Sequence, residues 1–441
     1  MILASTVVIS ITCALAQEPS ILERAEFQWS FPTRIELETP GGPLPFIIEV
    51  ASPTKESSDR DQYELSTTMP LRIVNGTEHI IMLNNLSGSG GGYDGSVRRA
   101  TIKFDHYASS LSGEGRSGCV IEGNLVERMR KGVWTKKRGD SHVRIPYQMI
   151  EVISTDDRFD SIEDSGESAA YSGRWSVKFD SSDDLAVGSF VVDKNQIATG
   201  TFLTTTGDYR YLSGRVDGNL MRLSTFDGAH AFLFHARMQD DGTIEGDFWS
   251  GNWWHETWTA VRDEDAKLPD AFGQTVIADE EALGGMVFKN LDGEPTRVLD
   301  VLDESGAKAR IIEIFGTWCP NCSDAGRELV SLREQYGDDL AVVGLAFEIT
   351  EDFERSVTQV KRHHEHIGTD WPILIAGLSD KDKASVALPI LDKVRSYPTL
   401  IFLNEDNEVQ SVYTGFMGPA TGDAYTEQRA KFEALIDGMI E

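Results

Sequence analysis

Residues 309–330 read A-R-I-I-E-I-F-G-T-W-C-P-N-C-S-D-A-G-R-E-L-V. A run of β-forming residues ends at Gly316, and Cys319 and Cys322 follow at the start of a segment that can continue as a helix. A buried strand that leads into a Cys-x-x-Cys at a helix start is typical of a thiol–disulfide redox site. We therefore interpret residues 309–330 as such a site.

The spacing assigns a role to each cysteine. Exchange needs a thiolate, and the unpaired N–H groups at a helix start favour negative charge on Cys319. Pro320 suits the first helical position, where its missing N–H would have no partner. Two intervening residues keep Cys322 within bonding distance of Cys319. We expect Cys319 to be the nucleophile, Cys322 the resolving thiol and their disulfide the redox-active group, with no other cofactor.

Half of a zinc site is the alternative interpretation of the two cysteines. Four-cysteine zinc sites need a second pair, which the sequence lacks. His363, His364 and His366 follow about forty residues later, outside the usual finger spacing. We expect no metal.

Length and charge limit the classes of function. The chain has 441 residues, which predicts two or three domains. Its net charge of −30 argues against nucleic-acid binding and against docking on anionic lipid. No internal apolar run reaches the length of a membrane span, so we expect no transmembrane segment.

Residues 1–16 have the pattern of a secretory signal peptide. The segment is short and apolar and ends in a small-x-small cleavage pattern at Ala14 and Ala16, although no basic residue precedes Arg24. The residues before Cys13 form a poor lipobox, so we do not expect a lipoprotein. Export to the periplasm or cell envelope would place the chain in an oxidising compartment.

Residues 20–262 predict an all-β domain. Turn signals at residues 40–43 and 75–76 separate strand-like runs, and from Trp175 onward turns recur about every ten residues. This spacing is typical of an antiparallel barrel or sandwich, with a division into two sub-regions near residues 155–172. Cys119 lies in a strand-like run, and we expect a buried, inert thiol there.

Residues 201–258 are rich in aromatic side chains and also contain His230, His235 and His255. These residues could line a ligand pocket or bind a metal. Aromatic side chains more often fill a β core, and the three histidines lack ligand-like spacing. We expect core packing here.

Residues 263–283 are acidic and predict a linker, and residues 284–441 predict an α/β domain. Strand patterns fall at 286–289, 297–302, 340–347, 372–376, 399–403 and 409–413, and helix patterns at 320–336, 352–367, 381–394 and 424–440. Alternating strands and helices followed by a hairpin and a helix form the thioredoxin-like order.

Residues 316–322, together with Ser396-Tyr397-Pro398-Thr399, resemble the TlpA/ResA-like branch of the thioredoxin superfamily, which is related to the AhpC/TSA proteins. The resemblance covers about residues 275–441. It implies a cis Pro398 against the cysteines, protein thiol and disulfide substrates, and a membrane thiol donor. It also implies a substrate groove formed by Trp318, Pro320, Asn321, Tyr397 and Thr399.

Glu313 lies on the predicted strand, six residues before Cys319. A buried carboxylate there could accept the proton of Cys322, whereas a solvent-facing side chain would have no such role. Many family members carry an acid on the helix after the second cysteine, where this chain has Ala325. That departure makes Glu313 the better candidate for acid–base chemistry.

Peroxiredoxins carry the motif P-x-x-x-T-x-x-C around the peroxide-reactive cysteine. This chain lacks the motif, because Thr317 lies two residues before Cys319 and no proline precedes it at the required spacing. The sequence therefore predicts an exported thiol–disulfide oxidoreductase that reduces protein disulfides. The alternative prediction belongs to a different functional class: an envelope ligand- or protein-binding β module with an accessory redox domain.

Overall fold

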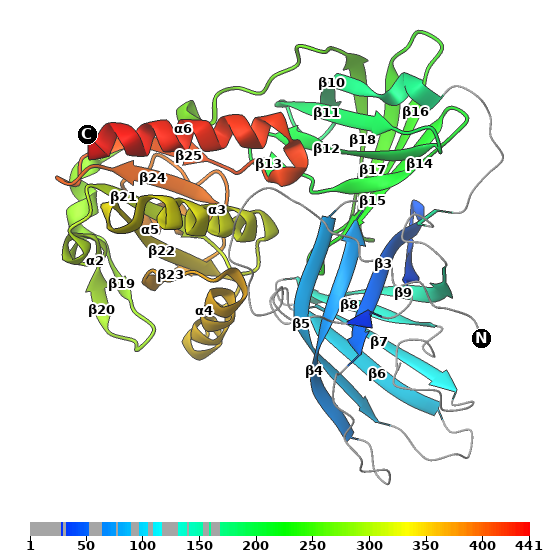
Figure 1. Cartoon of the computed structure of the whole chain (residues 1–441), viewed down its shortest axis with the longest axis horizontal. Coiled ribbons are helices and arrows are strands. Elements are labelled where there is room, and N and C mark those ends of the chain that lie inside the picture. The colour runs from blue at the N-terminus through cyan, green and yellow to red at the C-terminus, as the bar shows by residue number, and fades with distance from the viewer. Residues whose placement is uncertain are drawn as a thin grey trace, which may run out of the picture.

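The computed structural model describes residues 28–29, 32–52, 64–75, 78–89, 97–104, 109–116, 131–138, 141–152, 158–159 and 168–441. Within these ranges, two closed antiparallel sheets precede an α/β domain (Figure 1). The predicted multidomain fold, all-β followed by thioredoxin-like α/β, is confirmed. The predicted signal peptide, Cys13 and Cys119 lie outside the described residues.

The first sheet forms an antiparallel barrel. Its strands are β1 (Gln28–Trp29), β2 (Thr33–Thr39), β3 (Gly42–Ser52), β4 (Glu64–Asn75), β5 (Glu78–Ser89), β6 (Val97–Phe104), β7 (Ser109–Arg116), β8 (Lys131–Arg138) and β9 (Ser141–Glu151). The order β3-β2-β9-β8-β7-β6-β5-β4 closes through pairing of β3 with β4. Leu44, Phe46 and Ile48, at alternate positions of β3, belong to the core cluster of the barrel, and Ile47 between them is buried as well.

The second sheet closes in the same way. It follows the 3-10 turn η3 (Ser168–Tyr171) and contains β10 (Gly173–Phe179), β11 (Leu185–Val192), β12 (Ile197–Thr204), β13 (Gly207–Asp208), β14 (Leu212–Asp217), β15 (Leu220–Phe226), β16 (Ala231–Met238), β17 (Ile244–Ser250) and β18 (Trp254–Arg262). Pairing of β11 with β12 closes the barrel, and β13 extends its edge. Trp175, Phe202, Phe234 and Trp258 are buried in its core, so many of the aromatic residues pack as expected.

Three residues of the second barrel, Phe226, Ala231 and Leu233, belong to the core of the first. Phe226, at the end of β15, is fully buried, and its ring stacks on Phe46 at 3.9 Å between centroids. The side chain of Asn75 donates to the carbonyl of Phe226 at 2.9 Å and accepts from its N–H at 3.2 Å. Asn75 therefore forms hydrogen bonds with both backbone polar groups of Phe226.

The α/β domain is built on one seven-stranded sheet of order β20-β19-β23-β22-β21-β24-β25. Its strands are β19 (Val287–Lys289), β20 (Pro295–Arg297), β21 (Ala309–Phe315), β22 (Leu340–Glu348), β23 (Ile373–Leu378), β24 (Thr399–Leu403) and β25 (Val409–Thr414). Its helices are α2 (Val298–Ser305), α3 (Pro320–Tyr336), α4 (Phe353–Ile367), α5 (Lys381–Ala387) and α6 (Asp423–Ile440), with 3-10 turns η6 (Gly337–Asp339) and η7 (Pro419–Thr421). Every residue of β21 is buried, because helices cover both faces of the sheet.

Three predicted boundaries in this domain were wrong. The strand expected at 297–302 ends at Arg297, where α2 begins. The helix expected at 381–394 stops at Ala387, because Pro389 disfavours helical backbone at Leu388. The segment 263–283 is no free linker: Ala271 and Leu283, in the 3-10 turns η4 (Ala271–Gly273) and η5 (Glu280–Gly285), are part of the α/β core.

Among the described helices, none is long and apolar enough to cross a membrane.

Phe226→Ala should lower the free energy of unfolding by about 3–5 kcal/mol, since it removes a buried ring from the contact between the barrels. Phe226→Leu keeps most of the volume and should cost less than about 1.5 kcal/mol. Urea titration followed by tryptophan fluorescence measures both. A cost below about 1 kcal/mol for the alanine variant would contradict the proposed role of this ring.

Candidate redox site

Cys319 lies where β21 gives way to α3. It is the residue before the first helical residue, Pro320, and its sulfur accepts a hydrogen bond from the N–H of Cys322 at 3.2 Å. This bond satisfies one of the N–H groups that a helix start leaves without a partner. A negative charge on Cys319 would strengthen the bond, because hydrogen bonds to ionised acceptors are the stronger ones.

The two cysteines are free thiols with different exposure. Cys319 is 7% exposed and Cys322 is fully buried. Burial raises the pKa of the Cys322 thiol well above its usual value, and the neighbouring Cys319 and Glu313 raise it further. Cys322 therefore needs a base, whereas Cys319 is the thiol that a substrate can reach.

The segment before β24 forms the opposite wall of the site. The Tyr397–Pro398 peptide bond is cis, and the carbonyl of Tyr397 lies 3.6 Å from the Cys319 sulfur. Thr399 is fully buried, and its hydroxyl donates to the carbonyl of Ser396 at 3.0 Å. The Trp318 ring packs edge-on against Tyr397 at 5.6 Å between centroids. Trp318, Tyr397, Pro398 and the cysteine helix thus meet at one place.

Glu313 is buried rather than solvent-facing, with an exposed fraction of 1%. One of its carboxylate oxygens has no hydrogen-bond partner among the described residues. Burial raises the pKa of Glu313 to about 8. The interpretation of Glu313 as a buried residue is therefore correct. Its carboxyl group is mostly neutral below about pH 8.

The acids near the start of α3 have other partners. Asp324 pairs with Arg210 and Arg327, and Glu328 pairs with Arg429 at 2.8 Å. These pairings engage both carboxylates, whereas Glu313 has a carboxylate oxygen without a hydrogen-bond partner among the described residues.

Glu348 is a site residue that the sequence analysis missed. It ends β22, is 1% exposed, and accepts from the N–H and hydroxyl of Thr317 at 3.0 and 2.9 Å. Burial raises the pKa of Glu348, while these two bonds lower it. The only sequence signal was a carboxylate directly after a strictly apolar run, one residue beyond the predicted strand.

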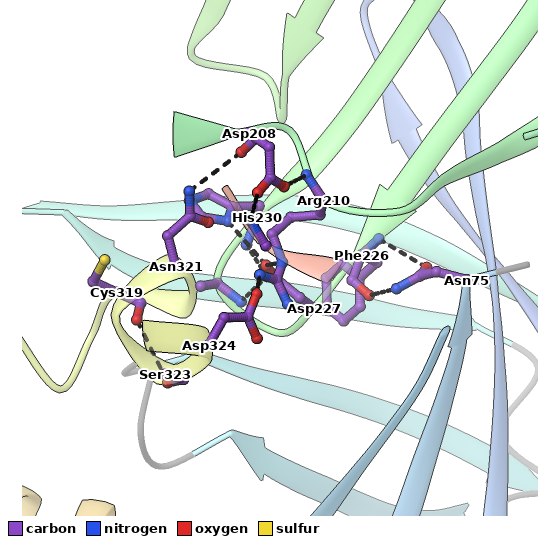
Figure 2. A network of polar contacts seen from close by, with 12 residues as sticks. Asn75, Asp208, Arg210, Phe226, Asp227, His230, Cys319, Asn321, Ser323 and Asp324 are labelled. Carbon is purple, nitrogen blue, oxygen red and sulfur yellow. Dashed lines mark hydrogen bonds and ion pairs between the residues drawn. The ribbon is translucent and has the colours of Figure 1, made fainter. Parts of the chain in front are cut away.

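A turn of the second barrel reaches the redox site, and the sequence analysis gave no hint of this contact. The side chain of Asn321, between the cysteines, donates to the carbonyl of Asp208 at 3.4 Å (Figure 2). Ser396 donates to the carbonyl of Thr206 at 2.8 Å. Arg210 forms an ion pair with Asp324 on α3 (Figure 2). The redox site is therefore built from two domains.

Two histidines of the second barrel each pair with one carboxylate, and His235 packs against the ring of Trp249. His230 lies 2.9 Å from Asp227, and His255 lies 2.8 Å from Asp247. In the part of the chain that the structure describes, no three His, Cys, Asp or Glu side chains are placed to hold a metal ion.

Known proteins are similar to part of this chain. The chain is 30% identical to the thioredoxin-like protein YneN of Bacillus subtilis over 130 residues, which are 30% of this chain and 68% of YneN. It is 30% identical to the thiol–disulfide oxidoreductase ResA of Halalkalibacterium halodurans over 142 residues, which are 32% of this chain and 70% of ResA. A scan against models of protein families gives no match.

Solved structures are similar over about a third of the chain. A secreted disulfide oxidoreductase of Mycobacterium tuberculosis is 18% identical, with 34% of this chain and 99% of that one covered and a TM-score of 0.25. A DsbF homologue of Corynebacterium diphtheriae is also 18% identical, with 39% and 98% covered and a TM-score of 0.27. The identity to YneN and ResA, together with the Cys-x-x-Cys on a thioredoxin-like fold, shows that this chain belongs to the TlpA/ResA-like family of thiol–disulfide oxidoreductases.

Proposed function

We propose that this oxidoreductase reduces protein disulfides through Cys319 and Cys322. The observation that carries the proposal is the bond from the Cys322 N–H to the Cys319 sulfur, on the one thiol of the pair that retains some exposure. The bond fixes the sulfur of Cys319 at the helix start, and the more exposed thiol of the pair is the one that can attack a substrate disulfide.

The reaction proceeds in two exchange steps. The Cys319 thiolate attacks one sulfur of the substrate disulfide, forms a mixed disulfide and displaces the other sulfur as a thiolate. The Cys322 thiolate then attacks the Cys319 sulfur and displaces the second substrate thiolate. Two electrons pass to the substrate, and the protons lost by Cys319 and Cys322 end on its two thiols. A thiol donor restores the pair by the reverse exchange.

Glu313 acts in the second step as the acceptor of the Cys322 proton. Both groups are buried, and charge on Glu313 raises the pKa of Cys322, so the two groups interact. Water has little access to either group, and the carboxylate offers the acceptor that solvent would otherwise provide. Because burial raises the pKa of Glu313 to about 8, its ionised fraction grows as the pH approaches that value.

The proposal includes export and a membrane partner. The signal-like segment at residues 1–16 supports export to the periplasm or cell envelope, and a structural relative from Mycobacterium tuberculosis is described as secreted. There a membrane thiol donor would keep the Cys319–Cys322 pair reduced against the oxidising surroundings.

The alternative function, a ligand-binding module, is supported by a cavity between the two barrels. Its volume is about 460 Å³, and Lys136 and Arg138 of β8 face Tyr209, His230 and Trp254 of the second barrel across it. Trp254 is 48% exposed, which is unusual for so large an apolar side chain. A ligand with an aromatic part and an anionic group would suit this lining.

The reductase proposal predicts a covalent trap. Cys322→Ser should accumulate mixed disulfides between Cys319 and substrate proteins, because the resolving thiol is lost, and Cys319→Ser should capture none. The wild-type chain should reduce insulin, and Cys319→Ser should lose at least about a hundredfold of that activity, since the serine hydroxyl is a far weaker nucleophile. Gel shifts reversed by dithiothreitol and insulin turbidity measure the two effects. Insulin reduction by Cys319→Ser at the wild-type rate would refute the assignment.

Glu313→Gln should slow the second exchange step by about tenfold or more, because Cys322 loses its proton acceptor. The wild-type rate of that step should rise as the pH passes through about 8, and the variant should lack this rise. Release of thionitrobenzoate from a preformed mixed disulfide on Cys319 reports the step directly. Equal pH profiles for the two proteins would contradict the role of Glu313.

The raised pKa of Glu313 also predicts how stability depends on pH. Between its ordinary value of 4.5 and about 8, the unfolded chain loses the Glu313 proton while the folded chain keeps it. The unfolded state therefore binds fewer protons, and the free energy of unfolding should fall across this window. Glu313→Gln should show a smaller fall, measured by urea titration at several pH values. A steeper fall in the variant would contradict burial of this carboxyl group.

A further inference from the structure

The turn between β12 and β14, residues 204–210, packs against α3 beside Cys319 and against the segment before the cis proline. Cys319 is only 7% exposed, and the neighbouring Pro320, Ser396 and Pro398 are buried. An attacking thiol that must meet a second disulfide needs access. The contacts of this turn therefore bear on which disulfides reach Cys319.

Residues 204–210 contact three segments of the α/β domain. Asn321, on the α3 side, donates to the carbonyl of Asp208 at 3.4 Å. Ser396, before the cis proline, donates to the carbonyl of Thr206 at 2.8 Å. Beyond β25, the N–H of Gly418 donates to the carboxylate of Asp208 at 2.6 Å. Two of these contacts, at Asn321 and Ser396, lie next to residues that flank the Cys319 thiol.

The turn and the α/β domain pack so closely that Gly207 and Gly415 could not be replaced by residues with a side chain. A Cβ atom at Gly207 would overlap the side-chain nitrogen of Asn321, and the backbone of Gly207 has a φ of +142°. A Cβ atom at Gly415 would lie 2.9 Å from the carbonyl carbon of Thr206. The turn therefore packs directly against Asn321 and Gly415, with no room for a larger residue at Gly207 or Gly415.

Charged contacts hold the turn in place. Arg210, with a left-handed φ of 65°, forms the ion pair with Asp324 and donates its backbone N–H to Asp208 at 2.6 Å. A left-handed backbone is costly for a side chain of this size and persists where its surroundings impose it. The side chain of Arg210 also lies 3.8 Å from Asp227, which a second bond ties to His230. Arg210 and Asp227 are buried, so solvent screens their attraction less than it would at the surface.

We infer that residues 204–210 are the specificity-determining element of the redox site. With the turn in place, Cys319 exchanges rapidly with low-molecular-weight disulfides and slowly with disulfides flanked by polypeptide. A protein disulfide is reduced only to the extent that its own chain displaces the turn. The inference rests on the proposed function of Cys319 and narrows its substrates; the two exchange steps and their electron balance are unchanged.

The test compares two substrates in a single turnover of the pre-reduced full chain. Oxidised 2-mercaptoethanol represents small disulfides, and insulin represents protein disulfides. Arg210→Ala removes the ion pair to Asp324 and should raise the rate with insulin by about tenfold or more. The rate with the small disulfide should change by less than about twofold, because small compounds already reach the thiol. Arg215→Ala, an exposed arginine on β14, is the matched control and should change neither rate.

Asp208→Asn provides a second variant in case Arg210→Ala does not fold. It should shift the substrate ratio in the same direction, while Asp193→Asn, the same change in the turn at the other end of β12, should not. If both site variants fold and keep the wild-type ratio of insulin to small-disulfide rates, the inference is overturned.

Alkylation separates this inference from the proposed function. In a Cys322→Ser background, iodoacetamide should label Cys319 much faster than a maleimide carrying a long polyethylene glycol chain, and Arg210→Ala should reduce that difference. Equal labelling rates by both reagents in the parent protein would contradict the inference that residues 204–210 restrict access to Cys319. If neither disulfide oxidises the wild-type pair, the redox proposal fails, and the labelling ratio still decides whether the turn covers Cys319.

Discussion

The hydrogen bond from the Cys322 N–H to the Cys319 sulfur is the interaction on which the site depends. This hydrogen bond forms because β21, which is buried on both faces, fixes the position at which α3 begins. Glu348 holds Thr317 in the intervening turn by two bonds, so that turn is positioned from a neighbouring strand as well. The thiol is thereby held at the helix end, where backbone N–H groups favour a thiolate.

Burial has two consequences in this site. It raises the pKa values of Cys322 and Glu313, which is the basis for the proton transfer proposed between them. It also leaves Cys319 only 7% exposed, and a turn of the second barrel packs against the neighbouring Asn321 and Ser396. Burial thus bears both on the proposed chemistry and on the access that we infer for substrates.

The second barrel joins the other two domains through consecutive residues. Phe226 packs in the core of the first barrel, and the next residue, Asp227, lies beside Arg210, which pairs with Asp324 on α3 (Figure 2). Burial disfavours charge on Asp227, but His230 and Arg210 lower its pKa to about 2. The carboxylate is thus ionised under most conditions, and the route from the first barrel to the redox helix consists of buried contacts that resist deformation.

The sequence by itself determined the local features of the redox domain. Strand burial and helix starts depend on residues close together in the sequence. The apolar run before Gly316 therefore indicated the strand, and the two cysteines with Pro320 indicated the helix start. The order of strands and helices and the all-β character of the N-terminal region followed in the same way. Only the tertiary structure decided the burial of Glu313, the role of Glu348 and the contact between the second barrel and the thiols. Arg210 and Asp324 are 114 residues apart, and which surface a polar turn meets depends on packing that no local pattern encodes.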